Sequence, residues 1–276
     1  VIKKTFNDGI EFLKGESILE TNINEMIFAY STKMAEGYVP KKVPFNKLHV
    51  MTQAPGYHWT NHQLVDEYRL EENVIPGFNM VVLDVDGECS IDTVTLLLKE
   101  YKSLIYVTKS HTEEVNRFRI VLPLTHTLTL CAKEYKEFMN NIYEWLPFEV
   151  DTSTNQRSRK WASHKGKHWY NDGELLDALQ FIPKTKKNDE RKKVIQDQQS
   201  MSNVERWFMG NTGEGNRSNQ LIKYALMLVD SDYDIDVVKN NVLALNSKLA
   251  EPMEEAEVHA TIMKTANKAF YRKDRL

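Results

Sequence analysis

The sequence predicts a protein of the α/β (α+β) class, in which a split β-α-β-β-α-β unit with an N-terminal α/β extension is followed by a small all-helical bundle. Three observations support this class. Between residues 80 and 150, short apolar runs rich in β-branched residues alternate with longer segments of helical periodicity. Residues 184–200 are almost entirely polar, as expected of a linker. After residue 200, apolar residues recur at helical spacing.

The elements of the split unit follow from local patterns. Met80 to Asp86 is an apolar run that ends at Gly87, which predicts a buried strand. Ser90 can cap the helix that follows. The predicted strands span 80–86, 104–108, 118–122 and 148–150, and the predicted helices span 91–101 and 130–145. This order is the one found in ferredoxin-like and RNA-recognition-motif-like folds.

The polar linker divides the chain into two predicted domains, residues 1–183 and residues 201–276. The region before Met80 mixes a helical candidate, Ser17 to Met34, with a stretch that contains proline and aromatic residues. We expect this region to form an α/β extension that packs on the same core. Hydrophobic residues make up 41% and charged residues 27% of the sequence, enough for such a core.

Composition excludes several classes of protein. The apolar runs are too short to span a bilayer, and no apolar signal core follows the opening residues, so the sequence predicts a cytoplasmic protein with no membrane partner. Cys89 and Cys131 are too few for a disulfide framework or a four-cysteine zinc site. The net charge of −3 argues against coating of nucleic acid through global charge, although residues 152–171 are basic and contain no acidic residue.

Asp84 and Asp86 form the first candidate site. Residues two apart in a strand point to the same side, so both carboxylates project together from the end of a buried strand. Such a pair repels itself unless a cation lies between its members, and hard oxygen ligands favour Mg²⁺ or Mn²⁺. The alternative is a pair of surface acids that merely ends a strand.

Further polar residues can extend this site. In a split β-α-β-β-α-β sheet the fourth strand lies beside the first, which brings Asp151 near Asp84. His111 follows the second predicted strand, and Arg119 lies on the third, where a guanidinium suits phosphate recognition. Trp161 could stack on a base or belong to the core. The basic residues after Asp151 are Arg157, Arg159, Lys160, Lys165 and Lys167.

The order of these motifs resembles the archaeo-eukaryotic primase superfamily, above all the primase-polymerases of phages and plasmids. The motifs are V-V-L-D-V-D-G at 81–87, S-H-T at 110–112 followed by R-F-R-I-V-L-P-L, and V-D at 150–151 with an arginine downstream. The resemblance implies that Asp84, Asp86 and Asp151 bind two catalytic Mg²⁺ or Mn²⁺ ions. It also implies that His111, with Ser110 at the small-residue position, contacts the incoming nucleotide. The family's arginine aligns with Arg159, and Arg157 is a close competitor.

The last part of the chain resembles the helical primase C-terminal domain. The similarity lies in the segments Gly215–Asn219, Ala244–Asn246 and Glu251–Met253, followed by Glu255 and Glu257. The loop before the first of these helices is basic, so Asn216 and Arg217 are the candidates for contact with nucleic acid or nucleotide. The other interpretation is that these residues only cap and pack a small bundle.

The resemblance implies a template-dependent DNA primase or primase-polymerase, a nucleotidyltransferase that joins NTPs or dNTPs on a single-stranded DNA template. It further implies phage or plasmid replication, a helicase domain or partner, and the host cytoplasm if the protein is phage-encoded. Two alternatives stay open: a noncatalytic module that binds single-stranded DNA or a replication origin, and a metal-dependent nuclease. The expected nucleotide-binding residues are Ser110, His111, Arg119, Arg157, Arg159 and Lys165, and the expected nucleic-acid-binding residues are Lys160, Trp161, Lys167, Asn216 and Arg217.

Overall fold

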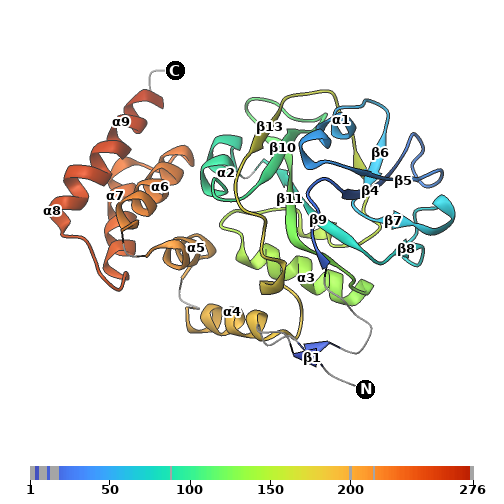
Figure 1. Cartoon of the computed structure of the whole chain (residues 1–276). Helices are drawn as coiled ribbons and strands as arrows, with labels where there is room; N and C mark the ends of the chain where they lie inside the picture. Colours follow the sequence, from blue (N-terminus) through green and yellow to red (C-terminus); the bar gives the residue numbers. More distant parts are fainter. Residues whose placement is uncertain are drawn as a thin grey trace. The chain divides into compact units, whose positions relative to one another are not determined.

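The structure is a computed structural model that describes residues 19–87, 89–198, 201–213 and 215–273, together with the backbone of β1 (Lys4–Thr5) and β2 (Glu11–Phe12) (Figure 1). The chain divides into two compact units. The first comprises residues 1–88, 98–144 and 149–197, and the second comprises 89–97, 145–148 and 198–276. The first unit contains antiparallel sheets and the chain ends in a helical region, which confirms the mixed α/β prediction at this level.

The main sheet of the first unit is built around one long strand, β11 (Arg117–Leu128). β11 pairs with β10, with β9 and, near its C-terminal end, with β3, and β13 extends the sheet past β10. The partner strands are β3 (Leu19–Glu20), β9 (Phe78–Asp86), β10 (Ser103–Val107) and β13 (His168–Asn171). The three strands predicted at 80–86, 104–108 and 118–122 are therefore confirmed. β11 is buried on both faces over 120–124, not half-buried as its alternation predicts.

Both predicted helices are present, but the predicted strand at 148–150 is wrong. α2 spans Ile91–Leu97, where the Ser90 hydroxyl accepts a hydrogen bond from Thr93 N, and α3 spans Ala132–Trp145. After α3 the chain makes a single backbone hydrogen bond to β9, from Asp151 N to Asp84 O at 2.8 Å. It then turns at once into the 3-10 helix η3 (Thr152–Thr154), so no ladder can form.

A second antiparallel sheet belongs to the N-terminal extension, in the strand order β12-β6-β4-β5. Its strands are β4 (Met26–Ser31), β5 (Val39–Val43), β6 (His58–Thr60) and β12 (Trp161–Ala162). The helix expected over 17–34 is wrong for the described residues, because β4 is a central strand that pairs on both sides. The short elements around the sheet are η1 (Phe45–Lys47), α1 (His49–Thr52), β7 (Gln63–Leu64), η2 (Val65–Glu67) and β8 (Val74–Ile75).

The core of the first unit joins its two sheets. Met26, Phe28 and Trp59 of the second sheet lie in one buried cluster with Met80, Val82, Leu104 and Val121 of the main sheet. Burial of such side chains contributes about 1.5–3 kcal/mol each. This cluster confirms that the N-terminal extension packs on the same core as β9, the strand that carries Asp84.

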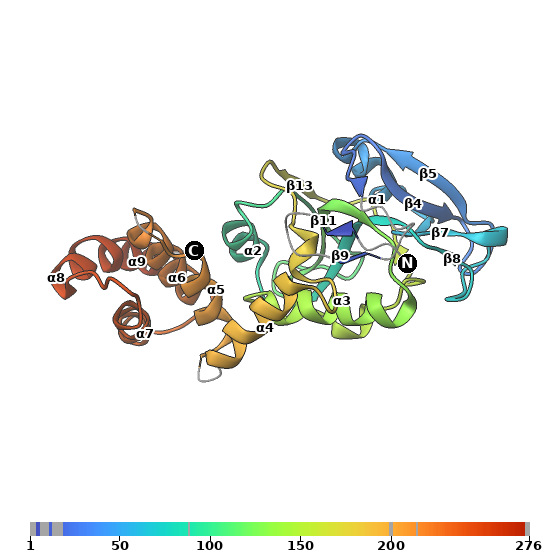
Figure 2. The same ribbon diagram turned by 60° about the horizontal axis from the view of Figure 1, so that its bottom comes forward.

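The segment expected to be an unordered linker is largely helical. α4 spans Lys186–Asp197 and lies beside α3, as Figure 2 shows. Arg191 pairs with Glu144 at 3.3 Å and lies over the ring of Phe181, and Lys192 pairs with Glu137 at 3.2 Å. The segment contains almost no apolar side chain, so these tertiary contacts with α3 and with the end of η4 (Ala178–Gln180) order it.

The second unit has a core made by amphipathic helices. In α6, Leu221, Tyr224, Ala225 and Leu228 are all buried, as their spacing predicts. The helices of the C-terminal region are α5 (Asn203–Asn211), α6 (Arg217–Asp230), α7 (Ile235–Ser247), α8 (Glu255–Glu257), the π-helical turn η5 (Val258–Met263) and α9 (Lys264–Lys273). Across the parts of the chain described, none of the helices has the length and apolar character needed to cross a membrane.

The start of α5 gives a test of the helical unit. The Ser202 hydroxyl accepts from Glu205 N, and the Glu205 carboxylate accepts from Ser202 N, which is a complete capping box. We expect Ser202→Ala to lower the free energy of unfolding by about 1 kcal/mol. Urea denaturation followed by circular dichroism measures the change, with the exposed Ser247→Ala as control. Equal stability of both variants would contradict a role for this cap.

Candidate functional site

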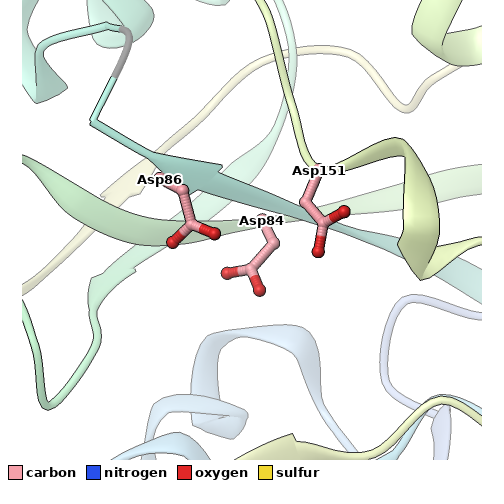
Figure 3. Close-up of side chains that lie close together, drawn as sticks. All are labelled: Asp84, Asp86 and Asp151. Atoms are coloured by element: carbon pink, nitrogen blue, oxygen red, sulfur yellow. The ribbon is translucent and has the colours of Figure 1, made fainter.

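Three carboxylates meet at the end of β9 (Figure 3). Asp84, Asp86 and Asp151 each offer an oxygen atom, and these atoms lie within 4.8 Å of one another. Asp84 is 7% exposed, Asp151 is partly buried and Asp86 is exposed. The triad is therefore open to solvent on the Asp86 side and closed at Asp84.

Strand pairing explains why these residues converge. Asp84 and Asp86 are two apart in β9, and their register partners on β11 are Arg119 and Arg117. The backbone bond from Asp151 N to Asp84 O holds the third residue beside the strand. The Asp151 carboxylate also accepts from Ser153 N at 2.9 Å, which fixes its direction as the cap of η3.

Arg119 holds the most buried member of the triad. Its Nε donates to Asp84 Oδ1 at 3.0 Å, and its Nη1 donates to the carbonyl oxygen of Ala162 at 3.0 Å. Burial raises the pKa of Asp84 and the proximity of Asp86 adds to this, while the Arg119 charge opposes it. Asp84 thus has one hydrogen-bonded cationic partner, a weaker influence from the Arg159 charge, and two acidic neighbours, and a further cation would relieve the remaining repulsion.

The donor set of the triad fits a hard divalent cation. All three groups are carboxylates, and the described cluster contains no cysteine or histidine, the softer ligands that favour zinc or copper. Mg²⁺ and Mn²⁺ are bound by one or a few carboxylates together with substrate phosphates. The triad could therefore hold such a metal ion, as the sequence predicts.

The two candidate arginines after Asp151 have different surroundings. Arg159 Nη2 lies 3.7 Å from Asp151 Oδ2, and its guanidinium lies over the Trp161 ring at 5.5 Å. Its Nε is buried without a hydrogen-bond partner. The side chain as a whole is 35% exposed, so an anionic ligand at the triad can reach the guanidinium through its terminal nitrogens.

Arg157, in contrast, is fully engaged. Its guanidinium donates to Glu71 Oε1 at 2.8 Å, to Glu71 O at 3.1 Å and to Leu130 O at 3.2 Å. The sequence reasoning missed Glu71 as the partner that fixes this side chain. No local signal links the two positions, which are far apart in the chain. The geometry favours Arg159 over Arg157 as the arginine that faces the triad.

His111 lies next to the same end of the sheet. Its Nδ1 accepts from Arg117 N at 3.1 Å, and Arg117 is the register partner of Asp86. This bond assigns the proton of the neutral imidazole to Nε2, which is then a donor. Ser110 is exposed, and its hydroxyl lies 3.4 Å from that of Thr108.

The structure contradicts one of the two predicted roles of Trp161, stacking on a base. It is 2% exposed and belongs to the core cluster between the sheets, so its ring cannot stack on a base. The guanidinium groups of Arg119 and Arg159 both lie over it, at 5.2 and 5.5 Å from the ring centroid. Trp161 thus supports two arginines of the site through cation–π contacts.

The remaining basic residues differ in exposure. Lys160 is partly buried, and this burial together with the charges of Arg69 and Arg159 lowers its pKa. Lys165 and Lys167 are exposed and form no ion pair with the described part of the chain. Both lysines are therefore available to an anionic ligand.

Tyr106 is a further residue that sequence reasoning missed. It is the register partner of Arg119 on β10, so Tyr106, Arg119 and Asp84 stand in one row across three strands. Burial raises its pKa to about 12, against the effect of the Arg119 charge. The alternation of β10 puts Tyr106 on one face, but only the pairing register reveals that this face carries the triad.

Comparison with known proteins adds one family. Residues 205–263 match the family Primase C terminal 1 (PriCT-1). This part of the chain is a PriCT-1 domain. No curated protein matches the sequence.

Two solved structures are similar to the chain. The AEP domain of the cyanophage S-2L primase-polymerase (PrimPol) shows 13% identity and a TM-score of 0.34, over 59% of this chain and 91% of that one. The primase RepB′ shows 11% identity and a TM-score of 0.31, over 92% of this chain and 95% of that one. Both TM-scores lie below 0.5, so neither similarity decides the fold or the function.

Within the PriCT-1 domain, the two predicted contact residues shape the loop before α6. Asn216 Oδ1 accepts from Gly213 N at 2.7 Å, and its Nδ2 donates to Asn211 O at 3.0 Å. Arg217 donates to the carbonyl oxygen of Glu251 and lies 3.5 Å from its carboxylate. These bonds agree with the capping and packing interpretation, and contact with nucleic acid stays a prediction.

Metal binding by the triad can be tested directly. We expect the protein to bind Mn²⁺, and we expect Asp151→Asn to weaken this binding at least about tenfold, since even changes outside the ligand shell cost that much. Titration with detection of free Mn²⁺ by electron paramagnetic resonance measures the dissociation constant. Asp172→Asn, at an exposed acid on the surface, is the control. An unchanged dissociation constant for Asp151→Asn would show that Asp151 is not a metal ligand.

Proposed function

We propose that the protein is a template-dependent DNA primase or primase-polymerase. The observation that carries this proposal is the occurrence, in one chain, of a carboxylate triad flanked by arginines and of a PriCT-1 domain. In this proposal residues 1–183 form the nucleotidyltransferase domain, residues 184–200 with α4 connect the two domains, and residues 201–276 form the primase C-terminal domain. Along the chain, the order β9, α2, β10, β11, α3 agrees with that of an RNA-recognition-motif-like core, with η3 after α3 in place of a fourth strand, although α2 groups with the second unit.

In this proposal the residues of the site bind the metal, the incoming nucleotide or the template. Asp84, Asp86 and Asp151 would hold Mg²⁺ or Mn²⁺, and Arg119 directs the buried Asp84 carboxylate and favours its ionised form. Arg159 and the Nε2 proton of His111 bind the triphosphate of the incoming nucleotide, with Lys165 and Ser110 nearer to solvent. Arg157 anchors the segment that carries Arg159. Lys160 and Lys167 contact the single-stranded template.

The proposed reaction is nucleotidyl transfer. The 3′-hydroxyl loses its proton to solvent, a bond forms between its oxygen and the α-phosphorus of the incoming nucleoside triphosphate, and the bond from that phosphorus to the departing pyrophosphate breaks. Two bound metal ions would stabilise the charge on the attacking and leaving oxygens. The arginine and histidine donors stabilise the negative charge of the triphosphate in a partly water-excluded site.

Primer synthesis on single-stranded DNA tests the proposal. The protein is incubated with circular single-stranded DNA, Mg²⁺ or Mn²⁺ and labelled NTPs or dNTPs, and the products are separated on a sequencing gel. Template-dependent labelled oligonucleotides support the proposal. Loss of the template instead indicates a metal-dependent nuclease, and salt-sensitive binding without incorporation under either metal indicates a noncatalytic DNA-binding module.

A further inference from the structure

The N-terminal extension contains a cavity of about 290 Å³. It lies between the face of β4 and β5 and the helical segment η1–α1. Three aromatic rings line it, those of Phe28, Tyr30 and Tyr57, and two lysines, Lys41 and Lys47, belong to its wall. Its volume lies just below the range of pockets for drug-sized ligands, so a single flat ring system would fill it.

The aromatic wall is continuous. The rings of Phe28 and Tyr30 are 6.1 Å apart and those of Tyr30 and Tyr57 are 5.9 Å apart. Tyr30 and Tyr57 are only partly buried, so each ring keeps an accessible surface. Aromatic surfaces of this kind attract planar groups, and every nucleobase presents such a group.

The charge of the cavity is positive. Lys41 and Lys47 are exposed and form no ion pair with any described residue, and no acidic side chain lines the cavity. The neighbouring Lys42 points to the other face of β5 and pairs with Glu25 at 2.9 Å. The two unpaired lysines on the cavity side are therefore complementary to an anion beside the planar group.

The cavity belongs to the same sheet that supports the triad's arginines. Trp161, beneath Arg119 and Arg159, is the register partner of Trp59. Trp59 packs edge-on against Phe28 with ring centroids 6.4 Å apart, and Phe28 lines the cavity. One row of aromatic side chains thus runs from the candidate site to the cavity.

We propose that this cavity binds one unpaired nucleotide of a single-stranded DNA strand, with the base on Tyr30 and Tyr57 and the phosphates on Lys41 and Lys47. The identification of the ligand as single-stranded DNA rests on the proposed function. The binding itself needs neither the triad nor a metal ion, so it can be tested apart from catalysis.

The first test measures binding of fluorescent (dT)₁₅ by anisotropy, without metal or nucleotide, over a range of salt concentrations. Lys41→Gln with Lys47→Gln is expected to weaken binding roughly tenfold and to reduce the slope of log K against log salt by about 1.4, because two phosphate contacts are lost. Lys42→Gln is the matched control from the same strand and should keep the slope. Unchanged affinity and slope in the double variant would overturn the proposal.

The second test concerns the aromatic wall. Tyr57→Leu should weaken (dT)₁₅ binding roughly tenfold, whereas Tyr68→Leu, at an exposed tyrosine outside the cavity, should not. An oligonucleotide that contains 5-iododeoxyuridine should crosslink to Tyr30 or Tyr57. Displacement of (dT)₁₅ by an equimolar amount of thymidine monophosphate, or crosslinks only to other peptides, would overturn the assignment. If these variants behave as expected but the protein never incorporates a nucleotide, the proposal that the cavity binds DNA is supported and the proposed polymerisation is wrong.

Discussion

Replacement of both Asp84 and Asp86 by asparagine is expected to lower primer synthesis by about a thousandfold or more. The change keeps the shape of both side chains and removes two of the three negative charges that attract the metal. It removes the mutual repulsion within the triad but also the charge that pairs with Arg119, so the free energy of unfolding is measured alongside activity. Incorporation of labelled nucleotides per folded molecule measures the effect, and circular dichroism verifies the fold.

The control for this experiment is Asp66→Asn. Asp66 is exposed and lies outside the triad, and its positive φ of 54° is one that asparagine tolerates. This variant should retain full activity. If the double variant also retained it, the triad would have no part in the reaction and the proposed function would lose its main support.

The second large effect is expected at Arg159. Arg159→Gln should reduce kcat/KM for the incoming nucleotide roughly a hundredfold, because a donor aimed at a charged substrate in a partly buried site is lost. Stability should fall by about 1 kcal/mol or less, since the side-chain contacts of Arg159 among the described residues are a long ion pair, at 3.7 Å to Asp151, and a cation–π contact with Trp161. Steady-state kinetics at varied nucleotide concentration, with urea denaturation in parallel, separates the two effects.

Arg157→Gln is the matched counterpart and should show the opposite pattern. It removes a guanidinium that is bound to Glu71 and Leu130, so the free energy of unfolding should fall by about 2 kcal/mol. Activity per folded molecule should stay within a few-fold of the unaltered protein. If Arg157→Gln abolished catalysis without loss of stability, the assignment of the two arginines would have to be exchanged.

The sequence predicted those elements that the apolar pattern of a single segment is enough to identify. β9 was predicted from a continuous apolar run and α3 from apolar residues at helical spacing, and the structure contains both. The strand expected at 148–150 failed because pairing needs a continuous partner, and Asp151 leaves the sheet after one bond. β4 was mistaken for part of a helix because its hydrogen bonds go to β5 and β6, strands that its own sequence does not reveal.

The candidate site was predictable to the extent that strand alternation governs it. Asp84 and Asp86 share a face by period two, and the expected position of the last strand beside the first brought Asp151 near them, although that strand does not form. The burial of Trp161 and the link between Arg157 and Glu71 depend on contacts between the two sheets and between distant loops. Such contacts are properties of the three-dimensional packing and leave no trace in residue type or spacing.

The hydrogen bond between Asp151 and Asp84 has a consequence for how the site is assembled. It joins two segments that are distant in the chain, with two strands and two helices between them, so the triad exists only after the intervening strands have docked. By thermodynamic linkage, any ion that prefers the complete triad stabilises the docked state, by about 2.7 kcal/mol at a hundredfold excess over its dissociation constant. The metal would then act as a late folding ligand for the first unit as well as a participant in its chemistry.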